Sequence, residues 1–259
     1  MECVSTPAIG WDPAAGGTDG RERQRSMTDH PNHCYPHDAH KSCSSAYLAA
    51  RVAAVCRRHG VRRVLDIGCG NGTLCRTLAD AGLSVVGLDP SPSGIACARR
   101  LVPEGSFYEM GVEADPDLLP DAGFDAVVST EVIEHLPSPA LLLQFAAAKL
   151  RDRGILVIST PYHGYLKNLL ISLSGRWDSH HTSLWDGGHI RFWSRRTLTR
   201  LFLENGFGVL EFHGAGRVPF LWKSMILVGR RAEWHGGGAD RERVGCTSVD
   251  RAPVDDETV

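Results

Sequence analysis

The sequence has no long apolar run, no strong charge imbalance and no closely spaced cysteine pair. No segment approaches the ~18 consecutive apolar residues that a membrane-spanning helix needs, and the first residues contain no apolar core of a signal peptide. A net charge of −2 provides no global attraction to nucleic acid or to an anionic membrane. Because the eight cysteines include no C-x-x-C pair, we expect reduced thiols and a soluble, cytoplasmic protein.

The middle of the chain contains no internal repeat and no Gly/Pro-rich linker. Residues 1–33 and 232–259 are rich in Gly, Asp and Arg and show no periodicity, which predicts disordered ends. Residues 34–231 are therefore predicted to form one domain. Their length is ordinary for a single α/β domain, and so is the composition of the chain, with 42% hydrophobic and 22% charged residues.

Helical and strand patterns alternate through this domain. An amphipathic helix is predicted over 44–60, and a later one, "SPALLLQFAAAKLRDRG", is expected to end at Gly154. Seven segments have strand patterns: "VRRVLDIG", "SVVGLD", "SFYEM", "FDAVVST", "ILVIST", "FGVLEFHG" and "WKSMILVGRR". The repeated βα units predict an α/β fold with a Rossmann-like, doubly wound, mostly parallel sheet of seven strands. Such sheets bind their ligands at the carboxyl ends of the strands.

A glycine-rich turn, "VLDIGCGNG", follows the first predicted strand. Gly68, Gly70 and Gly72 allow a tight turn and a close approach of the backbone to a ligand. The second strand ends at Asp89, where a carboxylate can accept hydrogen bonds from both hydroxyls of a ribose. The G-x-G-x-G spacing differs from the dinucleotide pattern G-x-G-x-x-G, and Asp66 lies two residues before the turn. A dinucleotide oxidoreductase is therefore disfavoured.

The pattern D-x-G-x-G-x-G, with an acidic residue at the end of the next strand, resembles the class I S-adenosylmethionine-dependent methyltransferases over about residues 44–231. The resemblance implies that the turn wraps the amino-acid part of the cofactor, that Asp89 binds its ribose, and that the last strand is antiparallel. It also implies that the segment from Gly111 flanks the adenine. The predicted cofactor-binding residues are Asp66, Gly68, Cys69, Gly70, Gly72, Asp89, Pro90, Val112, Glu113 and Thr130.

Two carboxylates and an imidazole follow the fourth predicted strand, in "STEVIEHLPSP". Glu131, Glu134 and His135 are spaced i, i+3 and i+4, so a helix would present all three on one face. One interpretation is that Glu131 caps the following turn while the other two are solvated. A functional role is favoured, because all three follow a strand at the edge of the sheet where ligands bind. Carboxylate oxygens and imidazole suit Mg²⁺, Mn²⁺ or Zn²⁺.

The sequence E-V-I-E-H resembles the ubiquinone-biosynthesis O-methyltransferases, and the small-RNA 2′-O-methyltransferases have a similar E-x-x-E-H. In the latter the motif binds a divalent metal together with one more histidine. By this resemblance His189 in "WDGGHIRFWSRRTL" is the fourth ligand, and His163, His180 and His181 compete for that role. Without a metal, His135 is the candidate general base. The predicted catalytic residues are His135, Glu131 and Glu134, and the predicted metal ligands are Glu131, Glu134, His135 and His189.

An insert over 161–194 follows the fifth predicted strand. Leu166, Leu169, Leu170 and Leu173 form an i, i+3, i+4, i+7 stripe, and the simpler interpretation is a lid helix that packs on the domain. The resemblance to the ubiquinone methyltransferases implies instead peripheral membrane contact through 165–173 and an apolar acceptor. Four arginines, at 191, 195, 196 and 200, are expected to lie on a solvated face.

The predicted function is transfer of a methyl group from S-adenosylmethionine to an oxygen of a small, apolar or quinol-like acceptor, assisted by a divalent metal. Two alternatives remain open. An RNA 2′-O-methyltransferase would use the same metal cluster, but the chain shows neither an additional RNA-binding domain nor a basic net charge. A non-catalytic, partner-binding methyltransferase fold is disfavoured by the intact glycine turn and the intact cluster.

Overall fold

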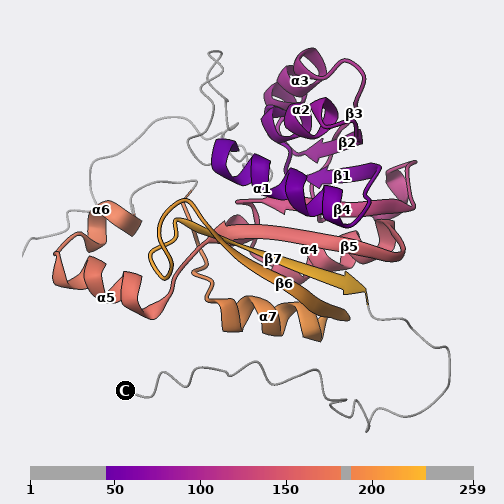
Figure 1. Cartoon of the computed structure of the whole chain (residues 1–259). Helices are drawn as coiled ribbons and strands as arrows, with labels where there is room; N and C mark the ends of the chain where they lie inside the picture. The colour runs from indigo at the N-terminus through magenta and orange to yellow at the C-terminus, as the bar shows by residue number, and fades with distance from the viewer. Residues whose placement is uncertain (1–44, 182–187, 232–259) are drawn as a thin grey trace, which may run out of the picture. The chain divides into compact units, whose positions relative to one another are not determined.

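The computed structural model describes residues 45–181 and 188–231 (Figure 1). The predictions for residues 1–33 and 232–259 lie outside the described residues. Seven strands form one sheet in the order β3-β2-β1-β4-β5-β7-β6. The strands are β1 (Arg63–Ile67), β2 (Ser84–Asp89), β3 (Ser106–Glu109), β4 (Phe124–Thr130), β5 (Leu150–Pro161), β6 (Phe207–Ala215) and β7 (Ser224–Arg231).

Strands β1 to β5 are parallel to one another, whereas β7 is antiparallel to both of its neighbours, β5 and β6. A short connection joins β6 to β7, and strands so joined can pair only in the antiparallel sense. The predicted seven-stranded, mostly parallel sheet with an antiparallel closing strand is therefore confirmed.

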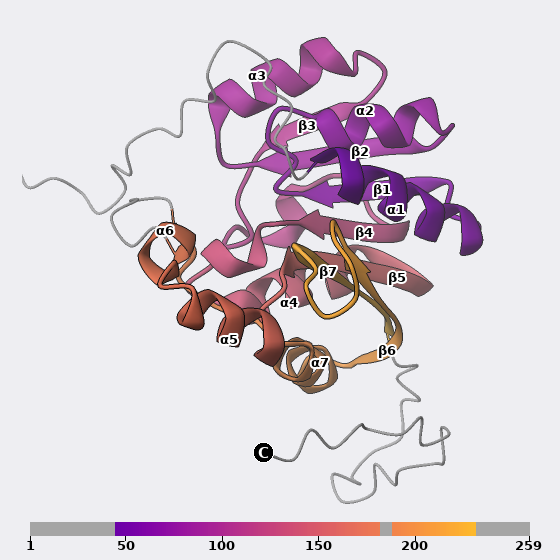
Figure 2. The same ribbon diagram turned by 60° about the vertical axis from the view of Figure 1, so that its left-hand side comes forward.

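Helices cover both faces of the sheet (Figure 2). One face packs against α1, α2 and α3, and the other packs against α4 and α7. The helices are α1 (Ser45–Arg58), α2 (Thr73–Asp80), α3 (Pro92–Leu101), α4 (Pro139–Lys149), α5 (Tyr165–Leu173), α6 (Trp177–His181) and α7 (Arg195–Glu204), with 3₁₀ turns η1 (Pro116–Leu118) and η2 (Ile133–His135). Figure 1 shows α5 and α6 at the side of the sheet where β5 ends.

The central strands are buried on both faces. In β5, Ile155 and Val157 pack with α1–α3, whereas Leu156 and Ile158 pack with α4 and α7. This double burial explains why "ILVIST" is apolar without alternation.

Helix α4 ends at Lys149, so the prediction that it continues to Gly154 is wrong. Leu150 already pairs with Phe124 of β4, and Arg153 has a left-handed φ of 61°. A Cβ on Gly154 would lie 3.1 Å from the Phe124 carbonyl oxygen. The chain turns directly from the helix into β5, because pairing with β4 outweighs the local helical preference of "LRDR".

The leucine stripe of α5 faces outward. Leu166, Leu170 and Leu173 are 43%, 45% and 75% exposed, while Lys167 on the opposite side is only 6% exposed. The interpretation that this stripe packs on the domain is therefore wrong for the described residues. A stripe at helical spacing predicts an apolar face, but what that face contacts is decided by the surroundings of the helix.

A charged cluster joins the end of α1 to β6. Glu211 accepts hydrogen bonds from His59 and His213, each at 2.7 Å, and from the Arg58 guanidinium. Partial burial acts to raise the pKa of Glu211, but the contacts with His213, His59 and Arg58 outweigh it and hold the pKa at about 2.

We expect Glu211→Gln to lower the free energy of unfolding at pH 7 by about 1 kcal/mol, since the cluster is partly exposed and water screens its charges. Because folding lowers this pKa, the stabilisation is present above the ordinary value of 4.5 and is lost as the pH falls towards 2. Urea unfolding at pH 7 and at about pH 3 measures both effects. Glu204→Gln, which breaks the exposed pair with Arg200, is the control. A difference that stays constant across this pH range contradicts the assignment.

Candidate active site

The glycine turn between β1 and α2 has a left-handed backbone at all three glycines. The φ angles of Gly68, Gly70 and Gly72 are 76°, 53° and 82°. A Cβ on Gly72 would lie 2.8 Å from the Ala98 Cα, and one on Gly68 would overlap the Val132 side chain. Glycine is needed here for the backbone conformation and for the close packing of α3 and of the segment before η2 against the turn.

Asp89 ends β2 with its carboxylate held by backbone groups of two segments. It is 6% exposed and accepts hydrogen bonds from the Gly70 N–H at 2.9 Å and the Ser91 N–H at 2.8 Å, one on each oxygen. The backbone therefore fixes the orientation of the carboxylate beside the turn, at the end of the strand where sheets of this kind bind the ribose of a cofactor.

Asp66, two residues before the turn, carries an oxygen that lacks a partner. Its Oδ2 accepts from the Cys75 thiol at 3.2 Å, whereas its Oδ1 is buried with no hydrogen-bond partner among the described residues. Burial raises the pKa of Asp66 to about 7, and the charge of Asp89 acts in the same direction. A cationic ligand would relieve this cost, and S-adenosylmethionine carries both an ammonium and a sulfonium. The turn therefore fits that cofactor.

The other predicted cofactor residues differ in their exposure. Cys69 and Val112 are buried in the core, Pro90 and Glu113 are exposed, and Thr130 ends β4 partly buried. Contact of these residues with the cofactor stays a prediction.

The E-V-I-E-H segment does not form an α-helix, so the prediction that its three polar residues share one helical face is wrong. Glu131 has a left-handed φ of 55°, and only Ile133–His135 forms a 3₁₀ turn. The Glu131 carboxylate accepts from the Ser159 hydroxyl at 2.8 Å and from the Ser224 hydroxyl at 3.2 Å. The backbone at Glu131 thus turns its side chain towards β5 and β7, away from an arrangement with the other two.

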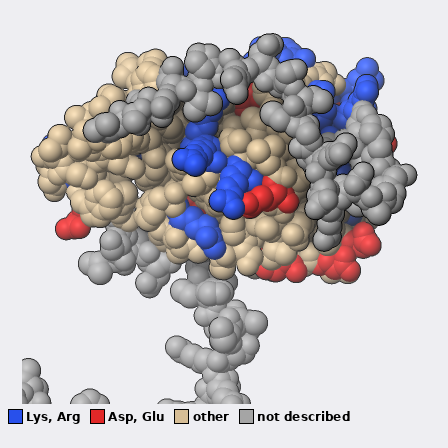
Figure 3. Space-filling view, turned by 90° about the horizontal axis from the view of Figure 1, so that it is seen from below, with Lys and Arg blue, Asp and Glu red and all other residues tan. Residues whose placement is uncertain are grey.

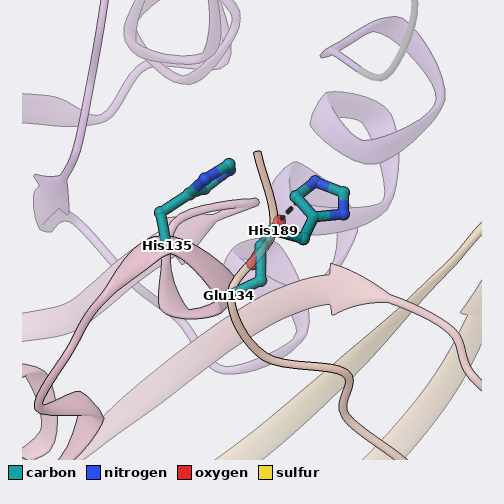
Figure 4. A group of neighbouring side chains, drawn as sticks. All are labelled: Glu134, His135 and His189. Carbon is teal, nitrogen blue, oxygen red and sulfur yellow. Dashed lines mark ion pairs between the residues drawn. The ribbon is translucent and has the colours of Figure 1, made fainter. Parts of the chain in front are cut away.

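Glu134, His135 and His189 come together instead (Figure 4). Each offers a donor atom, and these atoms all lie within 4.8 Å of one another. The two imidazole rings are 5.0 Å apart between centroids and nearly perpendicular. His189, and not His163, His180 or His181, is the insert histidine of this group. Glu131 as a further ligand stays a prediction, and the structure does not bring it into the group.

Glu134 provides the test of whether a metal ion fits. The residue is fully buried, its Oε2 accepts from the Thr160 hydroxyl at 3.0 Å, and its Oε1 has no hydrogen-bond partner in the part of the chain that the structure describes. That Oε1 lies 3.9 Å from the His189 Nε2. Burial raises the pKa of Glu134, and the nearby charge of Glu131 acts in the same direction. A divalent cation at this unpartnered oxygen would offset the cost, so the residues fit a metal ion.

A backbone carbonyl fixes the tautomer of His135. Its Nδ1 lies 3.2 Å from the Gly188 carbonyl oxygen, which can only accept a hydrogen bond. The hydrogen of a neutral His135 is therefore on Nδ1, and the lone pair is on Nε2. The same arrangement orients histidines that bind metals through the other nitrogen.

The stretch that carries His189 is clamped to the segment after β4. The backbone N–H groups of Ile190 and Arg191 both donate to the Glu134 carbonyl, at 3.0 and 3.1 Å. The Arg191 guanidinium donates to the carbonyls of Leu136, at 3.0 Å, and Pro137. Arg191 was expected on a solvated charged face. No sequence signal could identify its role, because its partners are main-chain oxygens far away in the sequence.

Comparison with known proteins agrees with this geometry. A family model described as a methyltransferase domain matches residues 25–211. The chain belongs to the class I S-adenosylmethionine-dependent methyltransferases.

Two curated relatives are ubiquinone biosynthesis O-methyltransferases. The protein from Bradyrhizobium diazoefficiens is 32% identical over 167 residues, which cover 62% of this chain and 64% of the relative. The protein from Azorhizobium caulinodans is 34% identical over 179 residues, which cover 66% of this chain and 65% of the relative. The chain thus spans less than two thirds of the length of these relatives.

A solved structure shows the same fold. Magnesium protoporphyrin IX methyltransferase from Synechocystis PCC 6803, with S-adenosylhomocysteine bound, matches with a TM-score of 0.53 at 21% identity. The match covers 71% of this chain and 82% of the other.

We expect Asp89→Ala to weaken the binding of S-adenosylmethionine by about 1–3 kcal/mol, because the ribose hydroxyls lose their acceptor. Asp89→Asn retains one acceptor oxygen and should bind with intermediate affinity. Asp80→Ala, which removes an exposed acid of α2 that pairs with Arg76, should leave the affinity unchanged. Isothermal titration calorimetry measures all three. An unchanged affinity in Asp89→Ala contradicts the placement of the ribose.

Proposed function

We propose that this protein is a methyltransferase that moves the methyl group of S-adenosylmethionine to an oxygen of a small acceptor. The observation that carries the proposal is the unpartnered, buried Oε1 of Glu134 beside His135 and His189. This group follows β4, the strand that pairs with β1, and β1 leads into the glycine turn. The names of the curated relatives support O-methylation.

Methyl transfer is an in-line displacement, so the protein contributes mainly by aligning the acceptor oxygen, the methyl carbon and the sulfur. Asp89 and Asp66 hold the cofactor from the side of the turn. When no metal ion is bound, His135 can act as the general base through Nε2 and take the proton of the acceptor hydroxyl as that oxygen attacks the methyl carbon. A divalent ion held by Glu134, His135 and His189 would lower the pKa of that hydroxyl.

The donor set narrows the choice of metal ion. Two imidazole nitrogens and one carboxylate suit borderline ions such as Mn²⁺ and Zn²⁺ better than Mg²⁺, which prefers oxygen ligands and retains several waters.

The surface of α5 supports an apolar acceptor delivered from a membrane. Its leucines face outward, and Figure 3 shows few charges on the side of α5 and α6, with Lys and Arg beside them and Asp or Glu next to one of these. The exposed arginines of α7 are Arg195, Arg196 and Arg200. An apolar ridge next to a basic strip suits peripheral contact with an anionic lipid surface. None of the described helices has the length and apolar character needed to cross a membrane.

For the metal, we expect chelator-treated protein to bind Mn²⁺ or Zn²⁺ in calorimetry. Glu134→Gln should weaken this binding by at least about tenfold. Removing a residue that only hydrogen-bonds to a metal ligand already lowers metal affinity by about tenfold or more, and Glu134 would be a ligand itself. Glu131→Gln should bind the ion nearly as wild type does, because the Glu131 carboxylate is engaged by Ser159 and Ser224. Both variants should keep their affinity for S-adenosylmethionine.

Turnover completes this test. Wild-type protein with Mn²⁺ or Zn²⁺ should methylate a catechol that carries an alkyl side chain, as detected by mass spectrometry, and EDTA should abolish the reaction. Full activity after EDTA treatment, with no metal found by elemental analysis, would leave His135 as the base and exclude the metal. Absence of both metal binding and methylation would overturn the proposed function.

For the membrane, we expect wild-type protein to sediment with liposomes that contain phosphatidylglycerol. Replacing Leu169 and Leu170 by Asp should abolish sedimentation while leaving the affinity for S-adenosylmethionine unchanged. Leu118→Asp changes a leucine that is 67% exposed in η1 and should have no effect. If the wild type stays in the supernatant, α5 does not contact lipid.

A further inference from the structure

The insert helix α5 turns its single cation inward. Lys167 is 6% exposed, although the leucines of the same helix lie at the surface. Burying an ammonium costs free energy unless hydrogen bonds or opposite charges compensate it. Packing of apolar side chains therefore does not explain why this helix exposes its leucines and buries its lysine.

Protein groups satisfy this ammonium only in part. The Lys167 Nζ donates to the Tyr162 carbonyl at 2.7 Å, which uses one of its three N–H groups. Within the described residues no carboxylate lies in ion-pair distance of it. Burial lowers the pKa of Lys167 to about 8 and Arg217 acts in the same direction, whereas Glu131 opposes them. The ammonium remains the main form at pH 7.

Two histidines beside Lys167 also carry unused hydrogen-bonding atoms. The rings of His163 and His181 stack with centroids 5.8 Å apart. The His163 Nε2 and both ring nitrogens of His181 are buried and have no hydrogen-bond partner among residues 45–181 and 188–231. Burial lowers both pKa values, that of His163 to about 4, and the charge of Lys167 acts in the same direction. Both rings are therefore neutral at pH 7, and each has one N–H to donate.

This group is separate from the metal-binding residues but adjoins them. The ring of Phe192 packs edge-on against His163 and His181, at 5.0 and 4.9 Å. Phe192 lies three residues after His189, so one stretch of chain contributes to both places. After burial and the charges of neighbouring histidines, the charge of Lys167 also contributes to lowering the pKa of His189. Within the described residues only Glu134, His135 and His189 gather as metal ligands.

We propose that His163, Lys167 and His181 form an anion-binding subsite of the acceptor pocket. The acceptor then carries a carboxylate or phosphate group in addition to the hydroxyl that is methylated. This second statement rests on the proposed function, whereas the subsite itself does not. An ammonium and neutral imidazole N–H groups are donors, and an anionic oxygen makes shorter and stronger hydrogen bonds with them than a neutral one does.

The test compares binding of two matched catechols to full-length protein saturated with S-adenosylhomocysteine. One catechol carries a carboxymethyl side chain and the other an ethyl side chain, so they differ mainly in charge. A third compound, with a phosphonomethyl side chain, distinguishes phosphate from carboxylate recognition. We expect calorimetry to show that wild-type protein prefers one of the two acids over the ethyl compound by about tenfold or more.

Four variants assign the preference. Lys167→Met should remove most of it, Lys167→Arg should retain it, and His181→Phe, which retains a ring beside Phe192, should reduce it. Lys149→Met is the matched control, because Lys149 is also a buried lysine, 4% exposed, that donates to a backbone carbonyl, that of Leu119 at 2.9 Å. The control should keep the wild-type preference. All variants should bind S-adenosylhomocysteine as the wild type does.

Two results would overturn the subsite. One is that the wild-type protein binds the acids and the ethyl compound with equal affinity. The other is that Lys167→Met lowers the affinity for all three compounds equally, because Lys167 would then only anchor α5. Failure of the proposed function looks different. A protein that binds the acid through Lys167 but methylates no catechol retains the subsite and refutes the reaction. Methylation of the ethyl compound without any preference for the acids supports the reaction and refutes the subsite.

Discussion

Buried carboxylates at the carboxyl ends of the parallel strands are the constraint on which this site depends. Asp66 lies in β1 one residue before its end, Asp89 ends β2, and Glu134 follows β4, and all three are nearly inaccessible to water. Each would destabilise the fold if it were unpaired. Backbone N–H groups donate to both oxygens of Asp89, whereas Asp66 and Glu134 each keep one oxygen without a hydrogen-bond partner among the described residues. The same two oxygens are where a cationic cofactor and a divalent ion would bind.

The clamp between Glu134 and Arg191 transmits this constraint to the insert. Main-chain hydrogen bonds at Glu134 and guanidinium contacts at Leu136 and Pro137 place His189 opposite His135. The contacts that hold His189 thus also hold the segment that follows β4. Helices α5 and α6 belong to the same insert as His189. The orientation of Lys167, the outward-facing leucines and the position of His189 are therefore features of one segment.

The glycine turn and Asp89 were predictable because they depend on local geometry. A left-handed φ at Gly68, Gly70 and Gly72 restricts those positions to glycine, and the parallel register then places the end of β2 beside the turn. The end of α4 and the face of the leucine stripe were not predictable in this way. Both depend on tertiary contacts. Helix α4 ends because Leu150 pairs with the neighbouring strand β4, and the leucines of α5 face outward because Lys167 of the same helix is buried.

The sequence by itself determined the order of strands and helices, the cofactor turn and the residue types of the group formed by Glu134, His135 and His189, since these follow from periodicity, glycine spacing and side-chain chemistry. Only the tertiary structure decided which of those residues meet. Helical spacing grouped Glu131 with Glu134, but a left-handed backbone at Glu131 directs that side chain to Ser159 and Ser224. His189 takes its place from far along the chain, because hydrogen bonds between main-chain groups, which leave no trace in residue identity, hold the two segments together.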